Sequence, residues 1–238
     1  MSERIVPTTS STVWTLAAVT LKRLGRGKAL WIGALIAALP PIFAAVFSAT
    51  RLHTRHVTPA PDDLFNISVS LLVILPAMFV GASIGEEIEE RTSTYLWSRP
   101  IARGAVLAGK LCALMPIVIL LIVGGWYAGV FIWAEAAPSL ASCIALAAGC
   151  VATSLVAAGI ATVVPKHGMA LTIGYMLVDL FIGAMPFSLN ELSVTNQTRE
   201  LANLFGGQPA IATPLIAMIA VSGVWAAVGF VRIRRLEV

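Results

Sequence analysis

Long apolar runs separated by short polar segments dominate the pattern of this chain. Six of the runs reach the length of about 20 residues that a helix needs, at a rise of about 1.5 Å per residue, to cross the hydrocarbon core of a bilayer. They are 29–49, 64–84, 111–133, 140–164, 169–189 and 210–231. None shows the alternation that is typical of membrane β-strands. The pattern predicts an all-α integral membrane protein with six transmembrane helices.

The composition supports this prediction. Of the 238 residues, 58% are apolar and 12% are charged, and the mean hydropathy is +0.89. Soluble domains carry about 25% charged residues, so the composition argues against a soluble enzyme, a disordered chain and a disulfide-stapled secreted domain. The longest connections have about 26 residues, whereas an independent domain needs about 50. We therefore expect a single transmembrane domain over 1–238, without an ATPase globule.

The placement of basic residues predicts the orientation. Thirteen of the sixteen fall on one side of the six-helix scheme, within 4–28, 91–110, 166 and 232–235. The other side holds Arg51, Arg55 and Arg199 together with several acids. Because the cytoplasmic side of a membrane protein carries the excess of lysine and arginine, both termini are predicted to be cytoplasmic.

Residues 12–28 differ from the six runs. The apolar residues of this segment, which include Trp14, are followed by Lys22, Arg23, Arg26 and Lys28. This arrangement suits a helix in the cytoplasmic interface whose cations reach anionic lipid. A basic flank that orients the first span is the alternative.

Asp179 is the acid nearest the middle of a predicted span. An ionised carboxylate there costs about 2.5–3.5 kcal/mol, so it should face the bundle rather than lipid. Two roles remain open, namely a group on a substrate path and a hydrogen bond between helices. No second acid or Ser/His pair accompanies it within the runs, which argues against an intramembrane enzyme.

Three other patterns are weaker. His53 and His56 lie near Asp62 and Asp63, but a solvated loop explains them better than a metal, and no metal site is predicted. Two Gly-x-x-x-Gly matches, 81–85 and 125–129, permit close helix approach and are weak pointers to a dimer face. Residues 104–110 fit the start of a phosphate loop. Because Leu111 and an apolar run follow, nucleotide binding there is rejected.

The segment 85–110 is the most informative. An acidic cluster precedes an aromatic and aliphatic patch, and then a basic stretch leads into the third span. Acids at the inner face and apolar residues in a cytoplasmic loop fit either a partner protein or an amphipathic helix under the bundle. The residues concerned are Glu86, Glu87, Glu89, Glu90, Thr92, Tyr95, Leu96, Trp97, Arg99, Pro100 and Arg103.

This segment resembles the type-2 ABC transporter permease family, whose six spans and cytoplasmic N-terminus the whole chain also matches. The matching residues, in order, are Glu86, Glu87, Glu89, Thr92, Leu96, Ser98, Pro100, Ile101, Arg103, Gly109 and Lys110. Arg91 departs from the family, which commonly has glycine there.

The resemblance implies a non-catalytic permease subunit that forms a homodimer in the bacterial inner membrane. It would bind two copies of a separate ABC ATPase, which carries the Mg-ATP, and would hold no cofactor or nucleic acid itself. The segment 86–103 would couple it to the ATPase, and 187–208 would form external or re-entrant helices. The work performed would be export, or force on an extracytoplasmic partner. A membrane scaffold or intramembrane enzyme is the alternative.

Overall fold

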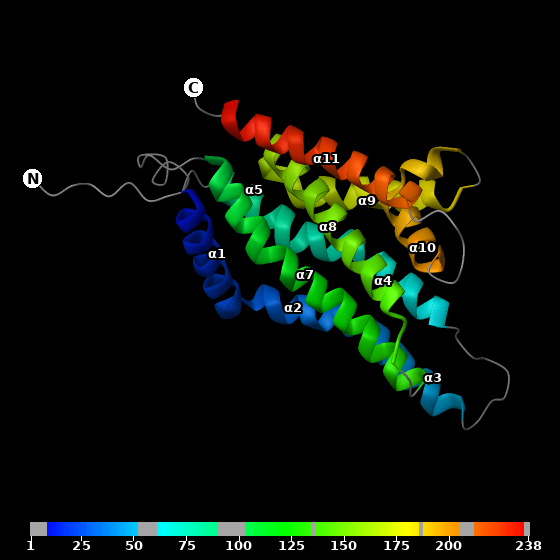
Figure 1. The fold of residues 1–238 in the computed structure, drawn as a ribbon. Helices are drawn as coiled ribbons and strands as arrows, with labels where there is room; N and C mark the ends of the chain where they lie inside the picture. The colour runs from blue at the N-terminus through cyan, green and yellow to red at the C-terminus, as the bar shows by residue number, and fades with distance from the viewer. Residues whose placement is uncertain are drawn as a thin grey trace, which may run out of the picture.

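The computed structural model describes residues 9–51, 61–89, 103–134, 137–185, 188–204 and 212–235. These residues form a bundle of helices and contain no strand (Figure 1). The helices are α1 (Thr9–Arg26), α2 (Lys28–Ala37), α3 (Leu39–Arg51), α4 (Pro61–Pro76), α5 (Ala82–Glu89), α7 (Arg103–Ala134), α8 (Leu140–Val163), α9 (Gly168–Gly183), α10 (Val194–Leu204) and α11 (Ala212–Arg235). Shorter turns are the π-helix η1 (Ala77–Gly81) and the 3-10 helices η2 (Pro165–His167) and η3 (Ser188–Leu192). The all-helical prediction is confirmed for the described residues.

Five helical stretches of the described chain are long and apolar enough to cross a membrane. They are Lys28–Ala49, Asp62–Glu89, Gly104–Ala134, Leu140–Val163 and Ala212–Ile233. Two of them extend beyond the predicted runs, because α5 continues the second span through the acidic cluster and α7 begins before Leu111. With 32 residues, α7 is about 48 Å long and exceeds the hydrocarbon core by several turns.

The fifth predicted span differs from the prediction. Its helix, α9, has 16 residues and ends at Gly183, so it measures about 24 Å rather than the length expected for 169–189. In the sequence, Pro186 follows three residues later, and a proline lacks the N–H group that a continuing helix needs. The apolar residues beyond it, which lengthened the predicted run, belong in part to η3.

The first span is bent between α2 and α3. Ala38 joins the two helices, and Pro40 and Pro41 follow in the first turn of α3. Proline lacks an N–H group and disturbs the preceding turn, which accounts for the break. The peptide N–H of Ala38 still reaches the carbonyl oxygen of Ala34 at 3.0 Å, so the chain turns without losing this hydrogen bond.

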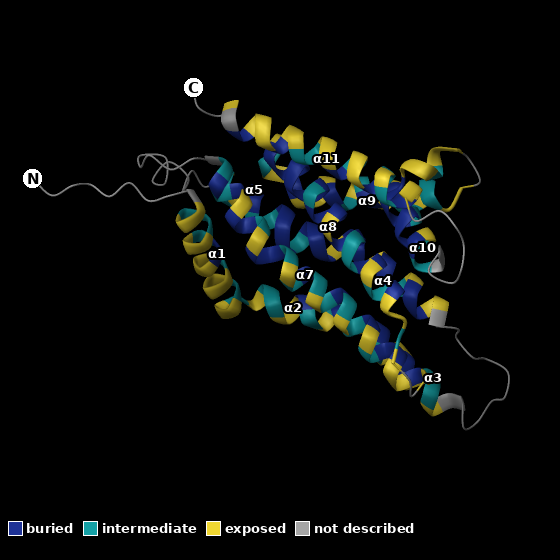
Figure 2. Cartoon of the chain, viewed as in Figure 1, coloured by how far each residue is buried: buried dark blue, intermediate teal, exposed yellow. Residues whose placement is uncertain are grey.

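Helix α8 forms the centre of the bundle (Figure 2). Fifteen of its residues are buried, and most of these are alanine, glycine, serine or threonine. Small residues allow neighbouring backbones to approach closely in a membrane bundle. At Gly159, for example, a Cβ would lie 2.5 Å from the carbonyl oxygen of Trp225 on α11. The apolar side chains exposed on α1, α2, α3 and α11 lie on the outside of the bundle.

The two ends of the bundle differ in charge. Figure 1 shows α1, the end of α5, the start of α7 and the end of α11 at one end, which we call the basic end. It holds the cations of 22–28, Lys110, Lys166, Arg232 and Arg235. The opposite end, which we call the outer end, holds the end of α3, the start of α4 and α10. Helix α1 packs on the long α7, where a Cβ at Gly109 would lie 3.0 Å from the carbonyl oxygen of Val13.

Candidate functional sites at the two ends of the bundle

The acidic cluster begins on α5 at the basic end. Glu86 and Glu89 are exposed there, whereas Glu87 is half-buried. The rest of the predicted coupling segment lies outside the described residues, which end at Glu89 and resume at Arg103. This applies to Glu90, Thr92, Tyr95, Leu96, Trp97, Arg99 and Pro100, and Arg103 is placed by its backbone as the first residue of α7.

Lys110 of α7 ties the acidic cluster to the bundle. Its ammonium group donates to the carbonyl oxygen of Ser83 at 2.6 Å and to the Ser83 hydroxyl at 3.3 Å, and it forms an ion pair with Glu87. Lys110 is 9% exposed. A buried ammonium group is costly without such partners. Lys110 therefore fixes the helices on either side of the predicted coupling segment to each other.

A second connection lies against the same acids. A Cβ at Gly85 would lie 2.6 Å from the carbonyl oxygen of Pro165, so glycine lets α5 rest directly on the turn η2. Beside this contact is a hollow of about 350 Å³ to which Glu86, Glu89, Lys166 and His167 contribute side chains. Two acids at this otherwise basic end therefore line the same hollow as Lys166 of the turn between α8 and α9.

At the outer end, Asp179 lies in the last turns of α9, four residues before Gly183, rather than in the middle of a span. It is 6% exposed. One carboxylate oxygen accepts the N–H of Val194 at 2.9 Å. The other accepts the N–H of Thr195 at 3.0 Å and the hydroxyls of Thr195 and Ser193 at 2.8 and 3.1 Å. The carboxylate thus sits on the N-terminus of α10, where peptide N–H groups lack helical partners and the helix dipole favours negative charge.

Helix α10 is held by two further contacts. The Nε of Arg199 donates to the side-chain oxygen of Asn66 on α4 at 2.9 Å. Burial lowers the pKa of the Arg199 guanidinium, and the charge of Asp179 opposes this shift. Next to Arg199 along α10, Thr198 packs against Gly149 of α8, where a Cβ would lie 2.6 Å from the threonine hydroxyl. Contacts with α4, α8 and α9 therefore fix this short polar helix in the outer end.

Sequence reasoning identified Asp179 but missed its partners. Ser193 is the N-cap of α10, because its hydroxyl accepts the N–H of Asn196 at 3.1 Å. The run Ser193-Val-Thr-Asn has the composition of a helix start, which is the signal that would have located α10. Two roles were open for Asp179, and the observed hydrogen bonds to α10 support the role of a contact between helices.

A comparison with known protein families shows that the family model described as ABC-2 family transporter protein matches residues 20–230. This chain belongs to the ABC-2 transporter family. The resemblance inferred from the segment 85–110 is confirmed. A search of curated proteins finds no match to the chain.

Membership of the ABC-2 family makes the chain a multi-pass membrane protein and the permease subunit of an ABC transporter. Subunits of this family serve in transport, are generally non-catalytic and work with ABC ATPase partners.

In this ABC-2 protein, the glycines of both Gly-x-x-x-Gly matches pack against other helices and turns of the same chain. A Cβ at Gly125 would overlap the carbonyl oxygen of Ala37, and one at Gly129 would lie 3.0 Å from the backbone of Pro40. The backbone at the bend between α2 and α3 therefore packs directly on α7 at Gly125 and Gly129. Gly81 and Gly85 similarly face the η2 turn and the start of α9. The interpretation of these glycines as pointers to a dimer face is replaced by packing inside the subunit.

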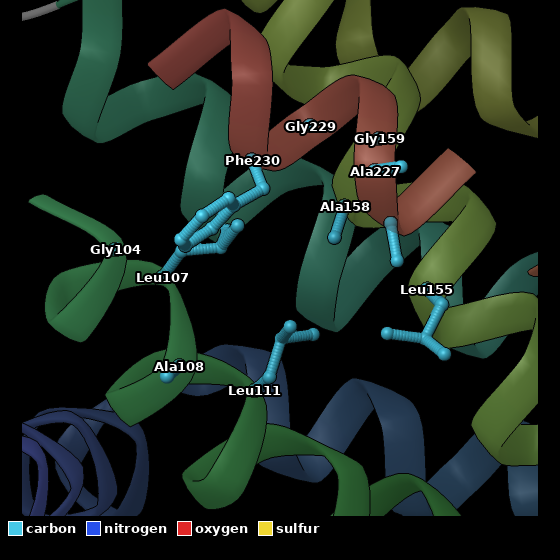
Figure 3. A pocket seen from close by; sticks show the side chains of 11 residues that line it. Gly104, Leu107, Ala108, Leu111, Leu155, Ala158, Gly159, Ala227, Gly229 and Phe230 are labelled. Atoms are coloured by element: carbon cyan, nitrogen blue, oxygen red, sulfur yellow. The ribbon is translucent and has the colours of Figure 1, made fainter. Parts of the chain in front are cut away.

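A groove of about 380 Å³ lies between α7, α8 and α11, and Figure 3 shows Leu107, Leu111, Leu155 and Phe230 around it. The side chains that line the groove are all apolar, and Gly104, Gly159 and Gly229 contribute bare backbone. A groove of this kind in a membrane protein offers space to hydrocarbon without a group that would select a ligand.

Proposed function

We propose that this permease subunit couples ATP hydrolysis by a separate ABC ATPase to export, or to mechanical work, across the bacterial inner membrane. The observation that carries the proposal is membership of the ABC-2 family over residues 20–230. The sequence of 86–103 adds to it, since acids and an apolar patch on a water-facing segment favour a protein partner.

The proposed assembly contains two copies of this chain and two ATPases, with Mg-ATP on the ATPases and no cofactor in the permease. The basic end faces the cytoplasm, so both termini are cytoplasmic, α1 lies in the interface and α9 completes six crossings. The accumulation of cations at one end supports this orientation. Helices η3 and α10 then lie on the extracytoplasmic side, where a further partner can be contacted.

The contacts at the basic end suggest how force would enter the bundle. The segment 86–103 is flanked by α5 and α7, which Lys110 joins through Ser83 and Glu87. Helix α5 also rests on Pro165, in the turn that precedes α9. A displacement of the segment by the ATPase would therefore move α5 and α7 together and push on α9.

The proposal is tested by purifying the tagged chain in mild detergent from its native host and identifying what accompanies it. An ABC ATPase is expected in stoichiometric amount. Replacing Leu96 and Trp97 by alanine should abolish this association while leaving membrane insertion intact. The matched control replaces Leu189 and Leu192, two exposed leucines of η3 at the outer end, and should retain the ATPase. Purification without any ATPase would instead favour a membrane scaffold or an enzyme that works alone.

A further inference from the structure

A hollow with an amphipathic lining lies along α11 at the basic end. It has a volume of about 340 Å³ and is lined by Val163 at the end of α8 and by one side of α11. The α11 residues include Val228, Arg232 and Arg235, and both arginines are exposed. The hollow therefore has apolar walls with two guanidinium groups at the end of the helix.

The apolar part continues on the other side of Val163, which is 41% exposed on the surface of the bundle. Val163 also lines a second hollow of about 230 Å³, formed with Ile160, Leu171, Tyr175 and Trp225. The rings of Tyr175 and Trp225 meet edge to face, with centroids 5.5 Å apart, and close this space between α9 and α11. The two hollows adjoin at Val163 and together run from the arginines toward the aromatic pair.

The lining of α11 follows one face of the helix. Trp225, Val228, Arg232 and Arg235 are separated by three, four and three positions, the spacing that places residues on one side of an α-helix. Along this stripe the character changes once, from apolar to cationic, in the direction of the basic end. Such an order matches an amphipathic molecule that lies parallel to the helix, with its charged group at the membrane surface.

We propose that these adjoining hollows bind an anionic phospholipid from the leaflet at the basic end, which is the cytoplasmic leaflet in the orientation proposed above. The phosphate lies between Arg232 and Arg235, and an acyl chain occupies the apolar part between Val163 and Trp225. Arginine binds phosphate through paired N–H groups, and basic pockets between membrane helices select anionic lipids. The groove of Figure 3 has a similar volume but no charged side chain in its lining, so it lacks this basis for selection.

The proposal is tested by native mass spectrometry of the tagged chain, delipidated in detergent and titrated with phosphatidylglycerol or with phosphatidylcholine. Phosphatidylglycerol should bind preferentially at low molar ratio. The double variant Arg232→Gln/Arg235→Gln should weaken its binding about tenfold or more, since each cation near a membrane surface contributes several-fold. The matched control Lys22→Gln/Arg26→Gln removes two exposed cations of α1 at the same end, which attract anionic lipid only at the open interface, and it should retain the binding at low molar ratio.

Two further measurements distinguish a specific lipid-binding site from a general attraction of anions to this end of the protein. Val228→Trp fills the hollow and keeps both arginines, so it should also weaken phosphatidylglycerol binding, whereas Ala108→Trp, in the groove of Figure 3, should not. Glycerol 3-phosphate, which lacks acyl chains, should not compete. Equal binding of the two lipids, full binding by Val228→Trp or the arginine variant, or competition by glycerol 3-phosphate would each overturn the proposal. The ATPase should still accompany all four variants, so this result is independent of the coupling function.

Discussion

The carboxylate of Asp179 accepts both the backbone N–H and the hydroxyl of Thr195, at 3.0 and 2.8 Å, although sixteen residues separate the two along the chain. The contact joins the end of α9 to the start of α10. In most helices the residue that caps the N-terminus belongs to the helix itself, as Ser193 does here. A second cap from a neighbouring span adds a negative charge at the positive end of the helix dipole, and it makes α10 part of the bundle.

Replacing Asp179 should therefore destabilise the outer end in a graded way. Asp179→Asn keeps one acceptor oxygen but turns an amide NH₂ group toward a backbone N–H, and should lower the free energy of unfolding by about 1–2 kcal/mol. Asp179→Leu leaves the N–H groups of Val194 and Thr195 without an acceptor, and should cost about 3 kcal/mol or more. Unfolding in mixed micelles with increasing SDS measures both.

Glu191→Gln is the control for these variants, because it removes an exposed acid from the adjacent η3. Its stability should equal that of the parent. If Asp179→Leu were as stable as the control, the hydrogen bonds of Asp179 would not contribute to the fold, and a role on a substrate path would regain support.

Gly125 and Gly124 provide a matched pair of positions for testing whether the bend between α2 and α3 packs on α7. A Cβ at Gly125 would overlap the carbonyl oxygen of Ala37, whereas one at Gly124 would meet nothing within 4 Å. Gly125→Ala should destabilise the protein by about 1–3 kcal/mol, because backbone must move to relieve the clash. Gly124→Ala should be neutral or slightly stabilising. Thermal unfolding in detergent distinguishes them, and equal midpoints would show that α2 and α3 do not pack on α7 as described.

The helical architecture could be read from the sequence because apolar length and charge placement are local properties. Five of the six predicted runs correspond to membrane-length helices of the described chain, and the fourth matches within one residue. The family could be predicted from the motif of 86–110, since several residue types recur there at fixed spacing. The basic end of the bundle could be predicted from the positions of lysine and arginine alone.

The contacts of individual residues could not be predicted in the same way. A lone acid in an apolar run indicates that a partner exists, but it does not say which of many later N–H groups will provide it. For that reason Asp179 was recognised and Thr195 was not. The glycines of 125–129 likewise indicate close packing without identifying the partner, which is the backbone near Ala37. The end of α9 was misplaced because hydrophobicity continues past Gly183, whereas helical structure does not.

Lys110 should control the stability of the region that leads to the coupling segment. Lys110→Met removes the ion pair with Glu87 and the hydrogen bonds that the ammonium group donates to Ser83, and should lower the free energy of unfolding by about 2 kcal/mol. Adding Glu87→Gln should restore part of the loss, because the half-buried carboxylate that loses the ion pair with Lys110 is then replaced by a neutral amide. Lys166→Met, an exposed lysine at the same end, is the control and should have little effect. Equal stability of Lys110→Met and this control would contradict the anchoring role.

The short helix α9 provides the most demanding test of the six-crossing topology. At about 24 Å it is shorter than a hydrocarbon core of about 30 Å, so a crossing there requires local thinning of the bilayer or polar side chains that reach the surface. Single cysteines at Asp62, Lys166 and Ser188, in a background without Cys112, Cys143 and Cys150, report the side of each connection. In intact cells an impermeant maleimide should label positions 62 and 188 but not 166, and permeabilisation should expose 166. Labelling of 188 only after permeabilisation would mean that α9 enters and leaves on the same side, and the chain would then cross the membrane five times, with its C-terminus outside.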